Sequence, residues 1–435
     1  MRFTLALAVG RIVKFLGGLV KRSTNLPGEV AFKICGDFLS HFKFKGKIIA
    51  VTGSNGKTTT ANLAAHILRE NGYKVVNNSE GANLSFGIAS TLMSNCNMKG
   101  FVDADFVFLE VDERYSPKVF DAFAPDVLLV TNLFRDQVVR NGNPDIIFDI
   151  INGGLKEKTT LVLNANDPIS SNLGKNNKKV YYGMNESIVS SKTDDFITND
   201  CKVCPRCHGK LNYNYYHYNH IGNFECPTCG YKSEEYKYYI DMNNKDINNY
   251  SVNGIEIKTN MTTVFNVFNS AAAVAACCEC GVPIQKAVKA IETFSIAEDR
   301  YKEYMINGRK IVLLLTKQNS ISLDQSISYV LGQQDKGSIL LYINNSYYTE
   351  YKDVSWLYDV SFERLKNRID RVYCTGNRAY DLAVRMEIGG FDREQLVIIE
   401  DIKNVKEATG KTNETIYILA GTAFGNDDSI IEAFK

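Results

Sequence analysis

Short apolar runs alternate with helical patterns from residue 47 to about residue 182, and this alternation predicts a parallel sheet. The runs "KIIAVTG", "FVFLEVD", "DVLLVTN" and "TTLVLNA" are almost continuously apolar, as expected for strands that are covered on both faces. Helical stretches such as "TTTANLAAHILRENG" and "DIIFDIINGGLKEK" separate them. Because a crossover through a helix joins neighbouring parallel strands, this order predicts a doubly wound α/β sheet.

The same pattern divides the chain into three predicted parts. Residues 1–46 form an N-terminal helical segment, residues 47–298 a central α/β domain and residues 299–435 a C-terminal α/β domain. A segment rich in Tyr and Asn, at about 200–235, interrupts the central pattern. The pattern resumes at "TTVFNVFNSAAAVAACCECG", a predicted helix that closes the core of the central domain.

The C-terminal part repeats the alternation of strands and helices. The runs "GRKIVLLLT", "GSILLYIN", "RVYCTG", "QLVIIED" and "TIYILAG" predict strands. Helices are predicted at about residues 322–332, 378–388 and 402–408. We therefore expect a second sheet with its own hydrophobic core.

The first 22 residues, "MRFTLALAVGRIVKFLGGLVKR", predict an amphipathic helix. Arg11 and Lys14 interrupt the apolar run and no small-residue cleavage site follows, so a signal peptide is not expected. The helix either packs on the protein, which is the preferred interpretation, or lies at a membrane surface. No segment is long and apolar enough to span a bilayer. The apolar residues at helical spacing are Leu5, Val9, Ile12, Leu16 and Leu19.

Composition narrows the class of protein. The chain has 435 residues, of which 45% are hydrophobic and 23% charged, enough for two or three domains. A formal net charge of +1 argues against an extended surface for nucleic acid. The 11 cysteines are clustered rather than spread along the chain, which favours metal ligands and buried thiols over a disulfide framework.

Two Cys-x-x-Cys pairs with 18 residues between them predict a zinc ribbon. Four thiolates on two tight turns complete a tetrahedral Zn²⁺ site with no open position, so the metal is expected to be structural. The stretch "YNYYHYNH" between the pairs carries no cluster of Lys or Arg, which argues against nucleic-acid binding. Cys201 forms a competing pair with Cys204, and His208 and His220 are alternative ligands. The predicted zinc ligands are Cys204, Cys207, Cys226 and Cys229.

The motif "TGSNGKTTT" follows an apolar strand and precedes a helix, and this context predicts a phosphate-binding loop. Glycines let the backbone turn its N–H groups towards phosphate oxygens, Lys57 supplies a cation, and Thr58 offers a hydroxyl to Mg²⁺. Val51 stands where a strict Walker A loop has glycine, so the loop is a variant. The alternative is a glycine-rich turn without a ligand. The predicted loop residues are Gly53, Ser54, Asn55, Gly56, Lys57, Thr58 and Thr59.

Carboxylates end the strand "FVFLEVDE", at the edge where open α/β sheets bind ligands. One of them is expected to hold Mg²⁺ near Thr58, and Glu110 is the preferred candidate. For Asp112 and Glu113 the alternative is a solvated position in the following loop.

With these motifs in place, the chain resembles the Mur ligases and folylpolyglutamate synthetases, which activate a carboxylate as an acyl phosphate. "TGSNGKTTT" resembles their ATP loop, while "LNANDP" and "FNVFNSAAAVAA" resemble later motifs of their central domain. The resemblance implies that Asn266 and Asn269 lie near the adenine of ATP.

Within this family the chain is most similar to the MurT branch, the synthetase subunits of MurT–GatD lipid II isoglutaminyl synthases. That branch carries an inserted four-cysteine ribbon, and it also shares "LPGEVAFKI", "GANLSFGIAS", "TNLFRDQ", "DVSWLYDVSFE" and "TGNRAYDLAVR". The resemblance implies ATP-dependent amidation, with Mg²⁺, of the α-carboxylate of D-glutamate in the lipid II stem peptide. The resemblance further implies that a GatD-like glutaminase supplies the ammonia, and that the reaction takes place in the cytoplasm at the inner face of the membrane.

The resemblance also implies that Asp353, in "DVSW", is catalytic, since a carboxylate can orient ammonia or accept its proton. The alternative is a capping or turn residue ahead of a buried Trp356. Trp356 and Phe362 are interpreted as core anchors.

The chain departs from the family pattern at Asp299, at "KQNS" (317–320) and before Asp353. These departures keep two alternatives open: a ligase that joins an amino acid to a carboxylate, and a nucleotide-binding scaffold without catalysis.

Overall fold

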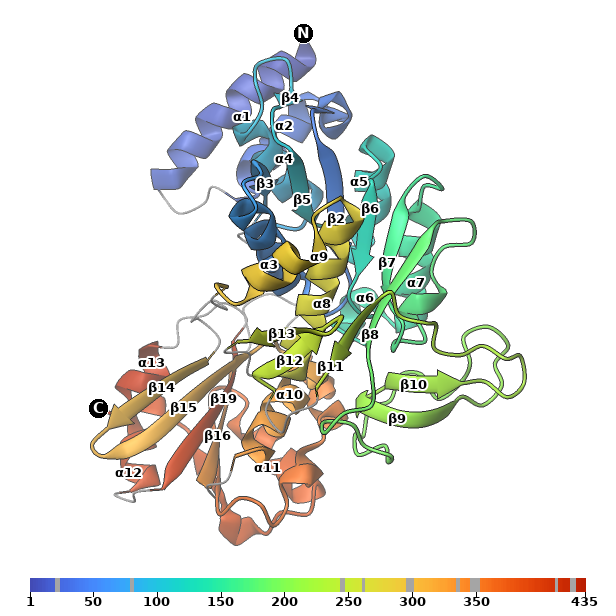
Figure 1. The fold of residues 1–435 in the computed structure, drawn as a ribbon. Coiled ribbons are helices and arrows are strands. Elements are labelled where there is room, and N and C mark those ends of the chain that lie inside the picture. Colours follow the sequence, from blue (N-terminus) through green and yellow to red (C-terminus); the bar gives the residue numbers. More distant parts are fainter. Residues whose placement is uncertain are drawn as a thin grey trace. The chain divides into compact units, whose positions relative to one another are not determined.

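The computed structural model describes most of the chain, and these residues form two units (Figure 1). The first unit comprises Met1–Arg135, Asn141–Lys192 and Asp200–Phe294, and the second comprises Asp136–Arg140, Thr193–Asn199 and Ser295–Lys435. The predicted boundary between residues 298 and 299 lies outside the described residues. The described residues are 1–19, 24–78, 82–242, 247–259, 263–294, 301–333, 337–344, 353–410, 414–422 and 428–435.

A nine-stranded sheet forms the centre of the described part of the first unit. Its strands, in spatial order, are β13 (Ile255–Lys258), β12 (Asn249–Val252), β11 (Tyr238–Asp241), β8 (Lys179–Met184), β7 (Thr160–Asn164), β6 (Val127–Val130), β2 (Lys47–Thr52), β5 (Phe106–Glu110) and β3 (Val75–Asn77). Neighbours from β11 to β3 pair in parallel, which confirms the predicted parallel sheet. The pattern analysis missed β3, β8, β11, β12 and β13, of which β12 and β13 form an antiparallel edge.

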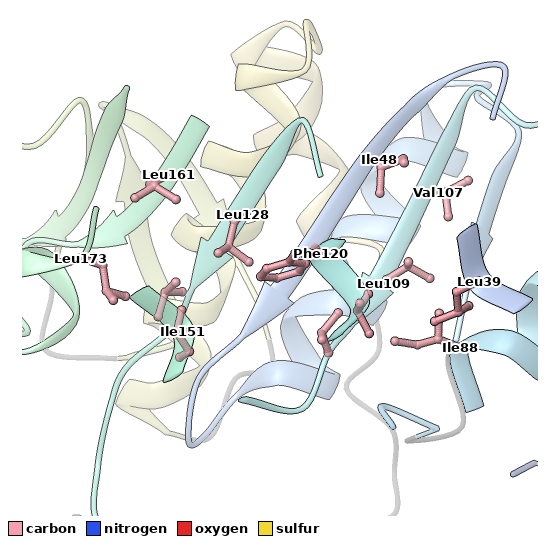
Figure 2. Close-up of a cluster of buried hydrophobic side chains, with 14 of the residues drawn as sticks. Leu39, Ile48, Ile88, Val107, Leu109, Phe120, Leu128, Ile151, Leu161 and Leu173 are labelled. Carbon is pink, nitrogen blue, oxygen red and sulfur yellow. The ribbon is translucent and has the colours of Figure 1, made fainter. Parts of the chain in front are cut away.

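Helices cover both faces of this sheet. Figure 2 shows one face, where Leu109 and Leu128 of the strands meet Ile88, Phe120 and Ile151 of the helices. The helices on that face are α4 (Ser85–Ser94), α5 (Ser116–Ala122) and α7 (Pro144–Gly154). On the other side α3 (Lys57–Glu70), α8 (Val264–Glu279) and α9 (Ile284–Ile291) pack together, and α3 and α8 contact the strands. The predicted core-closing helix is α8, and its residues from Val267 to Cys277 are buried.

The predicted N-terminal helix is α1 (Arg2–Leu19), which packs on α2 (Leu26–Ile34) and α4. It does not pack through the apolar positions that the pattern singled out, because Leu5, Ile12 and Leu16 are 54–59% exposed. Instead, Ala6, Leu7 and Gly10 are buried. A Cβ added at Gly10 would lie 2.7 Å from Met93 Sδ, so small residues set the inner face of α1.

The remaining elements of the first unit are short. They are η1 (Phe38–His41), β1 (Lys43–Phe44), β4 (Phe101–Val102), η2 (Glu113–Tyr115), η3 (Ser170–Asn172), β9 (Asn212–Tyr218) and β10 (Ile221–Glu225). Helix α6 (Val138–Asn141) belongs to the second unit except for its last residue. β9 and β10 pair as an antiparallel hairpin within the segment that interrupts the sheet.

The second unit has a sheet of its own, with six strands among its described residues. The spatial order is β14 (Tyr301–Ile306), β15 (Arg309–Thr316), β19 (Thr415–Thr422), β16 (Gly337–Asn344), β17 (Val372–Thr375) and β18 (Leu396–Ile399). All neighbours pair in parallel except β14 and β15. The five predicted strands are confirmed, and β14 was missed because its exposed and half-buried residues alternate too weakly to stand out.

The predicted helices of this unit are also present. They correspond to α10 (Ser320–Leu331), to α11 (Ala379–Ile388) and to η8 (Ile402–Asn404) continued by α12 (Val405–Thr409). The other helices are η5 (Ser355–Asp359), η6 (Phe362–Leu365), η7 (Arg393–Gln395) and α13 (Asp428–Glu432). Over all described residues of the chain, no helix is sufficiently long and apolar to cross a membrane.

Candidate functional site

The predicted phosphate loop connects β2 to the N-terminus of α3. Gly53 has φ of 127° and Gly56 has φ of 85°, a region that favours glycine. A Cβ at Gly53 would lie 2.3 Å from Thr131 Oγ1, and a Cβ at Gly56 would lie 2.3 Å from Asn269 Oδ1. Both the backbone conformation and the close neighbours therefore require glycine at these two positions.

The segment that follows β6 holds this loop in place. Asn132 O accepts a hydrogen bond from Ser54 N at 2.9 Å, and Asn132 Oδ1 accepts one from Asn55 N at 3.0 Å. Phe134 N donates to Ser54 Oγ at 2.8 Å, and Thr131 Oγ1 donates to Asn55 O at 2.7 Å. The sequence contained a signal for this role, since these residues begin the "TNLFRDQ" motif, but the motif alone did not predict the contact.

Lys57 forms a buried ion pair with Glu113. Its Nζ lies 2.6 Å from Glu113 Oε1 and 2.5 Å from Gly53 O, and the two side chains are only 9% and 6% exposed. The alternative of a solvated acid is therefore wrong for Glu113. It is also wrong for Asp112, which is 5% exposed and accepts a hydrogen bond from Arg114 N.

Glu110 offers a buried carboxylate oxygen at the end of β5. The residue is 2% exposed, and its Oε1 accepts a hydrogen bond from Asn83 Nδ2 at 2.9 Å. Its Oε2 is buried and has no hydrogen-bond partner among the residues that the structure describes. A buried carboxylate oxygen without a donor is costly unless a cation binds it, so Glu110 fits the role of a Mg²⁺ ligand. Thr58 is half-buried in the first turn of α3.

Asn266 and Asn269 lie in the first two turns of α8. Asn269 is 5% exposed, and its side chain lies against the backbone at Gly56, as the close approach of its Oδ1 indicates. Asn269 Nδ2 is 3.5 Å from Asn266 Oδ1. The two amides are thus neighbours, and one of them borders the phosphate loop.

The four predicted zinc ligands converge. All four sulfur atoms lie within 4.8 Å of one another. Cys204 Sγ is 3.7 Å from Cys229 Sγ, and Cys207 Sγ is 3.5 Å from Cys226 Sγ. Sulfurs at the corners of a tetrahedron around Zn²⁺, with Zn–S bonds of ~2.3 Å, would be about 3.8 Å apart. The cluster therefore has the size that zinc requires.

Two turns of the same kind build the cluster. His208 N donates to Cys204 O, and Gly230 N donates to Cys226 O, each at 2.9 Å. Burial alone would raise the pKa of Cys226, but the backbone N–H groups of Cys229 and Thr228 lower it to about 6. In the same cluster, burial raises the pKa of Cys204, and the pKa of Cys207 is raised to about 12. Cys226 is therefore the thiol of these three that most readily takes the thiolate form that binds metal.

The other ligand candidates lie outside this cluster of described residues. Cys201 is buried, and burial raises the pKa of its thiol well above the usual range. His208 is exposed, whereas His220 is fully buried with its Nε2 3.4 Å from Asp167 Oδ1.

The segment that carries the cysteines packs on the "LNANDP" loop. Tyr231 OH donates to Pro168 O at 2.8 Å, and Gly222 N donates to Asn166 O at 2.8 Å. The guanidinium of Arg206 stacks on the ring of Tyr231 at 3.9 Å. The cysteine cluster thus closes a segment that is fixed to the central sheet at the end of β7.

Asp353 lies in the second unit, just before η5. It is half-buried, its Oδ1 accepts from Ser355 N at 2.8 Å and its Oδ2 accepts from Ser355 Oγ at 2.9 Å. The carboxylate therefore has the turn-forming role that the sequence left open as an alternative. Phe362 is fully buried as expected, while Trp356 is only half-buried against the same core.

The "KQNS" residues of the second unit surround Asp136. Lys317 Nζ lies 2.5 Å from Asp136 Oδ2, and Asn319 Nδ2 donates to Asp136 Oδ1 at 3.1 Å. The sequence analysis treated these positions only as departures from the family pattern. Lys317 forms an ion pair with Asp136, and Asn319 adds a hydrogen bond to the same carboxylate. In the sequence, Asp136 follows the segment that holds the phosphate loop.

The comparisons with known proteins define the class. Residues 51–277 match a family model described as the Mur ligase middle domain. The fold resembles a pseudomurein peptide ligase type C from Methanothermus fervidus, with a TM-score of 0.71 and 20% identity over 92% of this chain and 81% of that one. It also resembles MurF from Acinetobacter baumannii, with a TM-score of 0.63 and 14% identity over 93% and 80%. The predicted Mur ligase-like α/β fold is confirmed.

A second family model and two relatives that match over most of their length identify the branch of Mur ligase-like proteins to which the chain belongs. Residues 315–424 match the model described as MurT ligase C-terminal. The chain is 32% identical over 404 residues to the lipid II isoglutaminyl synthase (glutamine-hydrolyzing) subunit MurT of Staphylococcus aureus (strain COL), covering 90% of this chain and 88% of that protein. It is 27% identical over 427 residues to the subunit of the same name from Streptococcus pneumoniae, covering 97% and 94%. The chain belongs to the MurT family and is an ATP-dependent ligase subunit.

Proposed function

We propose that the chain amidates the α-carboxylate of D-glutamate in the stem peptide of lipid II, giving D-isoglutamine. The γ-phosphoryl group of ATP passes to a carboxylate oxygen, which leaves ADP and an acyl phosphate. Ammonia then attacks the carbonyl carbon, phosphate departs with the C–O electron pair, and the nitrogen loses a proton. The names of the MurT relatives and the constrained phosphate loop support this reaction.

ATP binding is assigned to residues Gly53, Ser54, Asn55, Gly56, Lys57, Thr58 and Thr59, with Asn266 and Asn269 near the adenine. Lys57 exchanges its contact with Glu113 for the phosphates, since a triphosphate offers more negative charge than one carboxylate. Glu110 Oε2 and the Thr58 hydroxyl are the proposed Mg²⁺ ligands. When bound, Mg²⁺ neutralises charge on the phosphates during transfer.

Asp353 is the proposed catalytic residue of the second step. Its carboxylate, fixed by Ser355 and half-buried, is suited to orient ammonia and to accept the proton that the nitrogen releases.

Ammonia is proposed to come from a GatD-like glutaminase subunit. The relatives carry the word "subunit" in their names, and this chain contains no Gly-x-Cys-x-Gly elbow of its own. The proposed place of the reaction is the cytoplasm, at the inner face of the membrane, because the proposed substrate is a lipid.

Zn²⁺ is the proposed occupant of the cluster formed by Cys204, Cys207, Cys226 and Cys229. The spacing of the sulfurs and the repeated turns support a closed structural site. We infer that this zinc ribbon braces the "LNANDP" loop and takes no part in the chemistry.

Conversion of lipid II, with ATP and either ammonium or glutamine plus the glutaminase, tests the assignment. Mass spectrometry should detect an amidated product from the wild type and at least a hundredfold less from Asp353→Asn, because an amide cannot accept the proton. Ser355→Ala is the matched control, since it removes one donor to Asp353 and keeps the carboxylate. Replacing ammonium by amino acids distinguishes an amino-acid ligase. A wild-type enzyme that forms no amide at any ammonium concentration would refute the proposal.

A further inference from the structure

Helix α1 presents an apolar stripe on the side that faces away from the protein. We define this outer stripe as Met1, Leu5, Ile12, Phe15 and Leu16. Leu5 is 56% exposed, Ile12 59%, Phe15 75% and Leu16 54%. At 3.6 residues per turn the five positions fall within an arc of about 100°. They therefore form one continuous face.

The packing of α1 on the protein does not depend on the outer stripe. Helix α1 lies beside α2 and α4 (Figure 1). It packs with the opposite side, where Ala6, Leu7 and Gly10 are buried. Large apolar side chains in a contiguous exposed patch are uncommon on soluble proteins and usually mark an interaction surface. The outer stripe is thus available to bind another surface.

The charge around the outer stripe indicates what kind of surface would bind it. Residues 1–28 contain no acidic residue, and their five basic residues are Arg2, Arg11, Lys14, Lys21 and Arg22. Arg11 donates from Nε to Met93 O at 3.0 Å and from Nη2 to Cys96 O at 2.5 Å, and Lys14 donates to Ser94 Oγ at 2.7 Å. These acceptors are uncharged, so both side chains keep their positive charge while they are held against α4 and the segment that follows it.

Basic side chains beside an apolar helical face match an anionic lipid surface. In helical projection Arg2 and Arg11 border the outer stripe on its two sides. The exposed Arg2 can reach lipid phosphates, and Arg11 adds positive charge at the other edge, while the apolar side chains enter the acyl boundary. A protein partner would need an acidic rim around an apolar groove to offer the same match. An anionic lipid surface offers both an apolar layer for the stripe and negative charge for the basic side chains.

We propose that the outer stripe of α1 inserts into the interface of an anionic bilayer and holds the enzyme on the membrane. The helix lies parallel to the surface and does not span it. The biological reason rests on the proposed function, because a lipid-linked substrate is confined to that surface. The binding itself depends only on α1.

Vesicle flotation tests the inference with the full chain bound to its glutaminase subunit. The variant Ile12→Gln/Phe15→Gln/Leu16→Gln removes apolar area and keeps every charge. Ile146→Gln/Ile188→Gln/Ile388→Gln is the matched control, because these residues are 49%, 52% and 63% exposed elsewhere on the chain. Vesicles of phosphatidylcholine with roughly one third phosphatidylglycerol should bind the wild type and the control, and bind the stripe variant roughly tenfold or more weakly. Pure phosphatidylcholine, or about 0.5 M salt, should weaken wild-type binding.

Three results would overturn the inference. The first is a wild type that does not float with anionic vesicles, and the second is a stripe variant that floats equally well. The third is a stripe variant that loses the glutaminase subunit on gel filtration, which would make the stripe a protein interface. Amidation of lipid II in detergent micelles, where bilayer binding plays no part, separates the two proposals. Micellar activity without vesicle binding refutes only the membrane contact, and vesicle binding without micellar activity refutes only the proposed reaction.

Discussion

His220 and Asp167 form a fully buried pair, with His220 Nε2 3.4 Å from Asp167 Oδ1. His220 comes from the turn between β9 and β10, and its ring packs on Phe134 with a centroid distance of 4.3 Å. Asp167 Oδ2 accepts a hydrogen bond from Leu133 N at 2.9 Å. Since Phe134 N in turn bonds Ser54 Oγ, the inserted hairpin contacts the segment that positions the phosphate loop.

We therefore expect His220→Ala to weaken ATP binding. Loss of the buried ring should lower the free energy of unfolding by about 3 kcal/mol and leave Phe134 less constrained. Calorimetric titration of ATP should give a Kd several-fold higher, with unchanged zinc content. The exposed His208 provides the control, and His208→Ala should alter neither quantity. Equal ATP affinity in both variants would show that the hairpin does not position the loop.

Zinc removal should destabilise the first unit. Metal binding contributes folding free energy directly where the site does not exist in the unfolded chain. We expect Cys204→Ser to reduce zinc from one equivalent to none and to lower the thermal midpoint. Cys201→Ser changes a buried neighbouring thiol outside the cluster and should retain one equivalent. Elemental analysis of the two purified variants measures their zinc content, and thermal denaturation measures the midpoint. Zinc loss in the Cys201 variant would contradict the ligand assignment.

Lys57 combines a functional and a structural contribution, and a double variant separates them. Lys57→Met should abolish ATP binding and also leave Glu113 as a buried, unpaired carboxylate, at a cost of about 3–5 kcal/mol. Lys57→Met/Glu113→Gln should recover most of the stability, as measured by chemical denaturation, without recovering ATP binding. Nucleotide binding by the double variant would refute the role of the lysine in holding phosphate.

Much of this arrangement follows from local sequence pattern. The continuous apolar runs identified β2, β5, β6 and β7, because strands covered on both faces have no polar alternation. The phosphate loop and the four cysteines were also visible, since each depends on residues close together in the chain. The pairs Lys57–Glu113 and His220–Asp167 were not visible, because their partners are 56 and 53 residues apart and meet only through the sheet topology.

Helix α1 shows a second reason why sequence pattern does not predict the whole arrangement. Its period predicted the helix correctly, but the more apolar stripe faces outwards while Ala6 and Gly10 face the protein. Hydrophobicity alone could not rank these faces, because close helix packing here depends on small residues. Similarly, β12 and β13 are each only four residues long and mix polar with apolar residues, so their sequences gave no clear strand.

Stability should also depend on pH through His217, which lies in β9. Burial lowers the pKa of His217 to about 4, and its Nε2 is 3.1 Å from Met184 O. The unfolded chain has the ordinary pKa of about 6.5, so it binds a proton more readily than the folded chain between these values. The stabilising contribution is complete above pH 6.5 and is lost as the pH falls towards 4, by about 3 kcal/mol in total. Denaturant titrations at pH 7, 6, 5 and 4 measure the free energy of unfolding. It should fall more steeply with acid for the wild type than for His217→Gln, because the glutamine side chain does not titrate in this range. Because both proteins carry the same cysteines, acid release of zinc affects them alike and cancels in the comparison. Parallel curves for the two proteins would rule out His217 as the source of the acid sensitivity.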